Sequence, residues 1–152
     1  MPVPDYLDRL FVSTAFLFQI VLIIHFALRK WRFDFAIRYG MIVYALGVLA
    51  VLGGVILLLG GKPWSLWLAG FLYLVWGGYG CWIEYVKKIE WRSPIRWSIF
   101  VPYLLLYLAI VMFYWFPLAL IWKPLWYVYA VLFIISTILN VTSHQRPTDQ
   151  LV

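Results

Sequence analysis

The sequence predicts an all-α membrane protein, a single domain over residues 1–152 built as a bundle of five transmembrane helices. Of the 152 residues, 66% are apolar and only 12% are charged, against roughly 45–50% and about 25% in an average soluble domain. The apolar residues form five long runs, and a helix needs roughly 20 apolar residues to cross a bilayer. The runs lack the polar–apolar alternation of a transmembrane β-strand, which excludes a β-barrel.

The five predicted spans cover about residues 7–28, 35–59, 64–86, 94–116 and 124–141. Prolines mark most of the boundaries. Pro63 and Pro94 fit the first position of the third and fourth helices, where a missing N–H costs nothing. Pro117 is expected to stop or kink the fourth span, and Pro124 opens the fifth. The breaks around these prolines therefore favour five separate spans over four.

Positive charge is unevenly distributed along this chain of net charge +6. The loops after the first and third spans and the C-terminal tail carry nine of the 12 Lys and Arg residues, and the other side carries three. The positive-inside rule then predicts an N-terminus outside and a C-terminus in the cytoplasm. This pattern suits a prokaryotic inner (plasma) membrane. We expect the basic loops to contact anionic lipid, and we expect no nucleic-acid partner, because no folded basic domain is present.

Glycines recur every seven residues in the second and third spans, so each set lies on one helix face. Small residues let membrane helices approach closely. We therefore predict that the two spans pack as a tight antiparallel hairpin, and a glycine-lined path for a solute is the alternative. The expected pairs across the hairpin are Gly54 with Gly70, Gly47 with Gly77, and Gly40 with Glu84.

Polar residues inside the spans are functional candidates, because burying charge in hydrocarbon is costly. Gln19 lies within the first span. Several further polar residues lie near the cytoplasmic ends of the spans, at a similar depth in the membrane. This shared depth predicts a polar cluster, with Glu84 paired to Arg38 or His25. The simpler interpretation of Glu84 is an ordinary helix pair with Lys88, four residues later. The predicted cluster comprises His25, Arg38, Glu84, Arg96 and Asn140.

Catalytic, metal and cofactor sites are not expected. The only histidines are His25 and His144. A haem held by both would be geometrically conceivable, but His144 sits in a polar tail. A zinc site would need three or four clustered ligands. Cys81 is alone among apolar neighbours, which makes a thiol unreactive. Glycine-rich phosphate loops and hydrolase motifs are missing from the sequence.

Interior aromatic residues are the candidates for ligand binding. Most of the ten tryptophans fall near the span ends, where aromatic belts form, whereas Trp76 falls near the middle. Tyr103 and Tyr107 share one face of the fourth span. Buried Tyr and Trp usually pack against another helix. The alternative is a cavity for a sterol, porphyrin, quinone or carotenoid, lined by Trp76, Tyr79, Tyr103 and Tyr107.

The segment Phe100-Val101-Pro102-Tyr103-Leu104, together with five aromatic-rich spans, resembles the translocator protein family. That resemblance implies binding of porphyrins or sterols. The family carries the segment in its last helix, whereas here it lies in the fourth. The family's Asn- and Trp-rich motif and its long first loop have no counterpart in this chain, so no site residue is carried over.

Three functions are compatible with these observations. The leading one is a non-enzymatic subunit or accessory protein of a membrane complex, which contacts a protein partner or a second copy through its helices. The second is binding or transport of a lipophilic molecule by the interior aromatics. The third is an enzyme that acts on lipid head groups at the inner leaflet, using Glu84, His25 and the nearby arginines.

Overall fold

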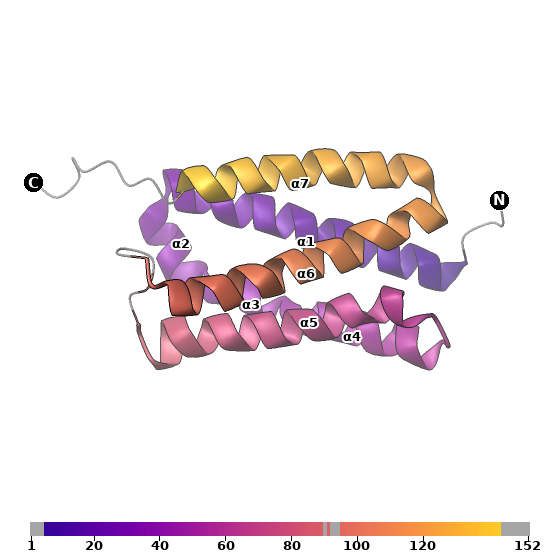
Figure 1. The fold of residues 1–152 in the computed structure, drawn as a ribbon, viewed down its shortest axis with the longest axis horizontal. Coiled ribbons are helices and arrows are strands. Elements are labelled where there is room, and N and C mark those ends of the chain that lie inside the picture. Colours follow the sequence, from indigo (N-terminus) through magenta and orange to yellow (C-terminus); the bar gives the residue numbers. More distant parts are fainter. Residues whose placement is uncertain (1–4, 90, 92–94, 144–152) are drawn as a thin grey trace, which may run out of the picture.

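The computed structural model describes residues 5–89, 91 and 95–143. In that part of the chain, five helical segments are long and apolar enough to cross a membrane, which confirms the predicted all-helical architecture of a multi-pass membrane protein. Consecutive spans run in opposite directions, so that α1 begins and α7 ends at opposite ends of the bundle (Figure 1). The five segments are Tyr6–Trp31, Met41–Leu59, Trp64–Val86, Trp97–Ile121 and Lys123–Ser143.

The spanning helices form a closed ring. Each one packs against the next along the chain, and the last returns to pack on the first. The elements are α1 (Tyr6–Trp31), α2 (Phe33–Tyr39), α3 (Met41–Ala45), α4 (Gly47–Leu59), α5 (Trp64–Cys81), the π-helix η1 (Trp82–Val86), α6 (Trp97–Ile121) and α7 (Lys123–Ser143). Helix α1 contacts α4 and α7 on its two sides and also reaches α6 across the ring.

The second span is shorter and less regular than the predicted residues 35–59. Residues Phe33–Tyr39 form the separate helix α2, and the spanning part is Met41–Leu59. Asp34 and Arg38 are exposed on α2, and charged side chains are costly inside a membrane span. A second interruption at Leu46 separates α3 from α4. There the Tyr73 hydroxyl donates to the carbonyl oxygen of Val43 at 2.6 Å.

The sequence predicts that Pro117 either stops or kinks the fourth span, and helix α6 does not stop there. It continues through Pro102 and Pro117 to Ile121, and the chain turns at Trp122, whose backbone is extended. Proline is tolerated inside membrane helices when neighbouring groups satisfy the freed backbone, and Pro117 is buried in the bundle. Pro94, the predicted start of this span, lies outside the described residues.

The start of α1 is tied to the turn between α4 and α5. Asp5 and Asp8 form a capping box at the helix N-terminus. The Lys62 ammonium lies 2.9 Å from an Asp5 carboxylate oxygen and 2.6 Å from an Asp8 oxygen. The hydrogen bond from Lys62 lowers the pKa of Asp5, and the Asp8 carboxylate raises the pKa of Lys62. Gly61 supplies the positive φ of 71° that this tight turn requires.

Helices α4 and α5 approach most closely at Gly54 and Gly70. A Cβ on Gly54 would lie 3.5 Å from the Gly70 Cα, and a Cβ on Gly70 would meet the Ala50 carbonyl oxygen. The expected pair of Gly47 and Gly77 is arranged differently, because both glycines lie against the ring of Tyr73. The missing side chains thus make room for a neighbouring backbone at one level and for an aromatic ring at the other.

Candidate functional site

The aromatic residues in the interior pack against one another. Trp76 is 2% exposed and lies at the centre of the group. Of the expected ligand-binding residues, the structure brings Trp76, Tyr103 and Tyr107 together, whereas the Tyr79 hydroxyl donates to the Ile99 carbonyl oxygen at 3.4 Å. In the structure these rings therefore contact one another. The centroid distances from Trp76 are 5.5 Å to Tyr44, 5.4 Å to Tyr73, 5.3 Å to Tyr103 and 6.5 Å to Tyr107.

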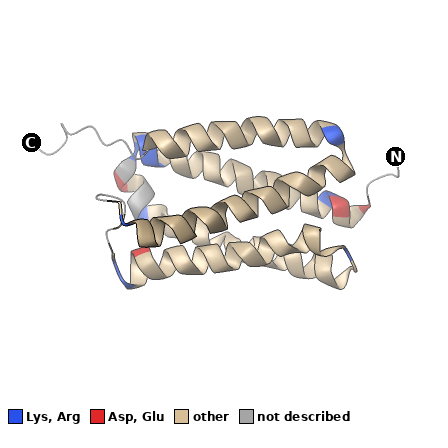
Figure 2. Ribbon diagram, viewed as in Figure 1, with Lys and Arg blue, Asp and Glu red and all other residues tan. Residues whose placement is uncertain are grey.

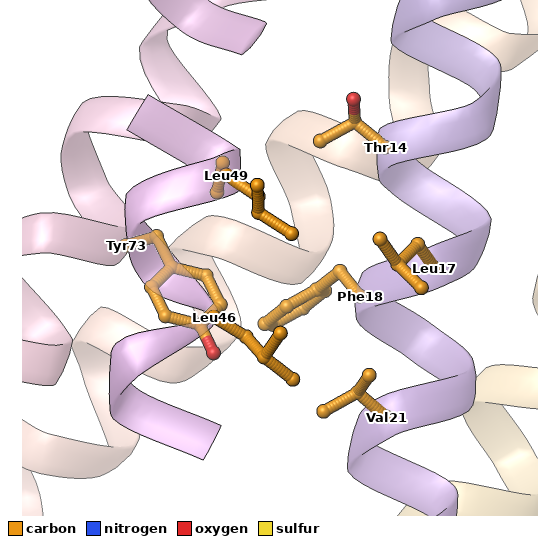
Figure 3. Close-up of a pocket in the computed structure, with 8 residues that line it drawn as sticks. Thr14, Leu17, Phe18, Val21, Leu46, Leu49 and Tyr73 are labelled. Atoms are coloured by element: carbon orange, nitrogen blue, oxygen red, sulfur yellow. The ribbon is translucent and has the colours of Figure 1, made fainter. Parts of the chain in front are cut away.

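A small apolar cavity of about 50 Å³ lies between α1 and the α3–α4 segment. Figure 3 shows Leu17, Phe18 and Val21 of α1 facing Leu46 and Tyr73 across it. A water needs two to four polar partners, and of the lining residues only Thr14 and Tyr73 carry side-chain hydroxyls. This cavity lies where α1 meets the second span, and we therefore base no ligand site on it.

A larger groove of about 240 Å³ lies between the α3–α4 segment and α5, and we call it the α3–α5 groove. Its floor contains the buried residues Gly47, Gly77 and Tyr73, and its rim contains exposed apolar side chains. Nothing lies within 4 Å of a Cβ placed on Gly78. The lining residues are Met41, Tyr44, Ala45, Gly47, Val48, Tyr73, Leu74, Gly77, Gly78 and Cys81.

The π-helix η1 positions Glu84 at the end of α5. The Tyr44 hydroxyl donates to a Glu84 carboxylate oxygen at 3.1 Å, a contact that the sequence did not predict. The wider turn is closed by a hydrogen bond from the Lys87 N–H to the Trp82 carbonyl oxygen at 2.8 Å. Such single π-turns inside helices often lie at functional sites.

The other residues of the predicted polar cluster lie on four different elements. His25 is half-buried on α1 with its ring 5.6 Å from that of Phe26. Arg38 is exposed at the end of α2, and Arg96 is exposed at the N-cap of α6. Asn140 lies on α7, where its backbone carbonyl accepts a hydrogen bond from the Ser143 hydroxyl at 2.7 Å. The structure thus places these four residues within two turns of a helix end or at a helix cap, on four different elements.

A second group of polar side chains lies in the bundle centre, between α1, α6 and α7, and we call it the interior polar cluster. Gln19 is fully buried and donates from its side-chain nitrogen to the Ser136 hydroxyl at 2.6 Å and to the Leu132 carbonyl oxygen at 3.2 Å. Three buried tyrosines stand beside this link, from α6 and α7. The cluster comprises Gln19, Tyr107, Tyr114, Tyr129 and Ser136.

Four atoms of the interior polar cluster have no hydrogen-bond partner within the described part of the chain. They are Gln19 Oε1 and the hydroxyls of Tyr107, Tyr114 and Tyr129. The indole N–H of the neighbouring Trp76 is unpartnered too. Buried polar groups are normally satisfied, so a concentration of exceptions marks a place that needs an explanation.

Sequence reasoning noticed Gln19 and Tyr107 but missed Tyr114, Tyr129 and Ser136. Their signal is spacing. Tyr107 and Tyr114 lie seven residues apart on α6, and the buried residues of α7 are Tyr129, Ser136 and Ser143, again seven apart. In antiparallel register, Tyr107 meets Ser136 and Tyr114 meets Tyr129. The last helix therefore docks through a polar stripe.

Metal ligands do not gather anywhere in the described residues, in which no group of three or more His, Cys, Asp or Glu side chains lies close enough to hold an ion. His144, the second histidine of the haem alternative, lies outside those residues. Comparison with protein-family models, with curated proteins and with solved structures finds no match to this chain. Its function is therefore inferred from the α3–α5 groove and the interior polar cluster.

Proposed function

We propose that this protein acts without catalysis, as a subunit or accessory protein of a membrane complex in a prokaryotic inner membrane. In this proposal, a transmembrane helix of a partner protein packs lengthwise along the α3–α5 groove. The single observation that carries the proposal is the groove itself, with its glycine floor and its apolar rim open to the bilayer. Gly78 is exposed in the groove and has nothing within 4 Å of a placed Cβ, and small residues allow close helix approach in lipid.

The dimensions of the groove favour a helix over a small ligand. Pockets for small molecules usually enclose about 300–1,000 Å³ and cover most of the ligand surface. The α3–α5 groove has about 240 Å³, and its rim residues Met41, Val48 and Leu74 are 54%, 61% and 57% exposed. A ring-shaped ligand would leave most of its surface in lipid and gain little, whereas a helix would insert one or two side chains and continue along the rim.

A photo-crosslinking amino acid at Gly78 tests the proposal in membranes of the source cell. Position 78 accepts a side chain, because nothing lies within 4 Å of a Cβ there. The matched control is Leu105, which is 61% exposed on α6 and away from the groove. We expect a discrete protein adduct from position 78 and only lipid adducts from position 105.

Two outcomes would contradict this assignment. An adduct of twice the mass of the chain would make a second copy the occupant of the groove. Lipid adducts alone from both positions would show that no protein packs there.

We also propose that the N-terminus faces outward and the C-terminus the cytoplasm. The charges of the described residues gather at the two ends of the bundle (Figure 2), and the positive side chains prevail at the end opposite Asp5. In a Cys81→Ala background, we expect Lys123→Cys to react with a membrane-impermeant maleimide in intact cells. Lys87→Cys should react only after the cells are opened, and the reverse pattern would invert the topology.

A further inference from the structure

We propose that the interior polar cluster binds a guest with hydroxyl chemistry. The guest is an oxygen that both donates and accepts hydrogen bonds, held between α1, α6 and α7. Two sources offer this chemistry inside a membrane, namely water and the hydroxyl head of a lipid-soluble alcohol. The proposal concerns the centre of the bundle and is independent of the partner helix proposed for the α3–α5 groove.

The burial of the cluster is the first argument. Gln19 and Tyr129 are 0% exposed, Tyr114 is 2% exposed and Tyr107 is 4% exposed. Each of these side chains nevertheless carries a polar atom without a partner in the described part of the chain. An unmet hydrogen bond in hydrocarbon is expensive, because bulk water cannot reach it. Several such atoms on neighbouring buried side chains indicate a missing partner, and a guest oxygen between them would supply it.

The orientation of Gln19 specifies the chemistry of the guest. The Leu132 carbonyl oxygen can only accept, so the amide nitrogen must face it, at 3.2 Å. The amide oxygen Oε1 then points elsewhere and requires a donor. A ketone or ether would leave that oxygen unmet. An ammonium would donate, but it would bring an uncompensated charge into hydrocarbon.

The tyrosines complete the match with a hydroxyl group. Each phenol can donate to the guest oxygen or accept from it. The Tyr107 hydroxyl lies beside that of Ser136, and Tyr129 lies near both Tyr107 and Tyr114. A guest oxygen can donate to Gln19 Oε1 and accept from two phenols at once. Its binding would tie α6 and α7 to α1, and it should therefore contribute to the docking of α7.

The sign of a stability change tests the proposal. If a guest holds the hydroxyls, Tyr129→Phe and Tyr114→Phe remove a used hydrogen bond. We then expect unfolding to become more favourable by about tenfold in equilibrium constant, which is ~1.4 kcal/mol. If no guest is present, the same changes delete an unmet polar group, and stability stays equal or rises. The matched control is Tyr127→Phe. Tyr127 is 58% exposed on α7, so this change should leave the unfolding equilibrium constant unaltered.

Measurements on the unmodified protein then separate the two sources. Native mass spectrometry of gently extracted protein should show a retained small-molecule mass if the guest is an alcohol. Proton-detected solid-state NMR should show contacts between bound water and the Tyr114 and Tyr129 ring signals if the guest is water. Neither signal, together with equal or higher stability of the phenylalanine variants, would overturn the proposal.

Discussion

Replacing Gly70 by alanine is expected to force α5 away from α4 and to lower the free energy of unfolding by about 3 kcal/mol. A Cβ at this position would meet the carbonyl oxygen of Ala50, and it would lie 3.1 Å from the Ala50 carbonyl carbon and 3.3 Å from the Gly54 Cα. All three atoms belong to backbone, so no side-chain rotation relieves the clash. Reversible unfolding in mixed micelles of the wild-type protein and the Gly70→Ala variant measures the loss.

Gly78→Ala is the matched control on the same helix. A Cβ at Gly78 meets nothing within 4 Å, and alanine favours a helix over glycine by up to about 1 kcal/mol. The control should therefore keep or slightly increase stability. Equal losses for the two variants would mean that glycine supplies flexibility to α5 rather than room for α4.

The second large effect is expected from Gln19→Glu, which should lower the free energy of unfolding by about 3–5 kcal/mol, the cost of an uncompensated buried charge. The wild-type amide donates to the Leu132 carbonyl oxygen and to Ser136. A carboxylate cannot donate to that carbonyl, so two acceptors would face each other in a site that is 0% exposed. Because the lost contacts join α1 to α7, protease sensitivity of the loop before α7 should rise along with the loss of stability.

Gln19→Leu separates charge from size. Leucine removes the hydrogen bonds but introduces no charge, and the Ser136 hydroxyl still donates to the Phe133 carbonyl oxygen at 2.9 Å. Hydrogen bonds between membrane helices contribute only about 0.6–1.7 kcal/mol, so we expect a loss of that size. If leucine is as damaging as glutamate, the shape of the glutamine side chain matters more than its polarity.

Much of the fold could be predicted from the sequence, because long apolar runs leave a membrane helix few alternatives. The ends of the spans were less predictable. Pro117 is a helix breaker in water, but inside a bundle its neighbours compensate for the missing N–H, and α6 runs on to Ile121. Helix α2, which carries Asp34 and Arg38, is separate from the second span. Its position depends on packing against the rest of the bundle, and a local sequence pattern does not encode such packing.

The candidate sites were harder to predict because they depend on contacts between distant spans. The seven-residue spacing of Tyr129 and Ser136 says which face of α7 is special, but not that this face meets Gln19 of α1. The same limit applies to Glu84, whose partner Tyr44 lies 40 residues earlier. The aromatic packing is a further example, since the ring of Trp76 on α5 lies 5.5 Å from that of Tyr44 on α3 and 5.3 Å from that of Tyr103 on α6.

The link between Gln19 and Ser136 sets an order of assembly. Chains emerge from the ribosome N-terminus first, so α1 enters the bilayer long before α7. The two partners of Gln19 on α7 lie 113 and 117 residues after it in the sequence. Until the last helix is synthesised, the amide of Gln19 faces lipid or a temporary partner. The docking of α7 is thus the step that completes the molecule, and a quality-control factor that recognises polar groups in the membrane could distinguish finished chains from unfinished ones at that position.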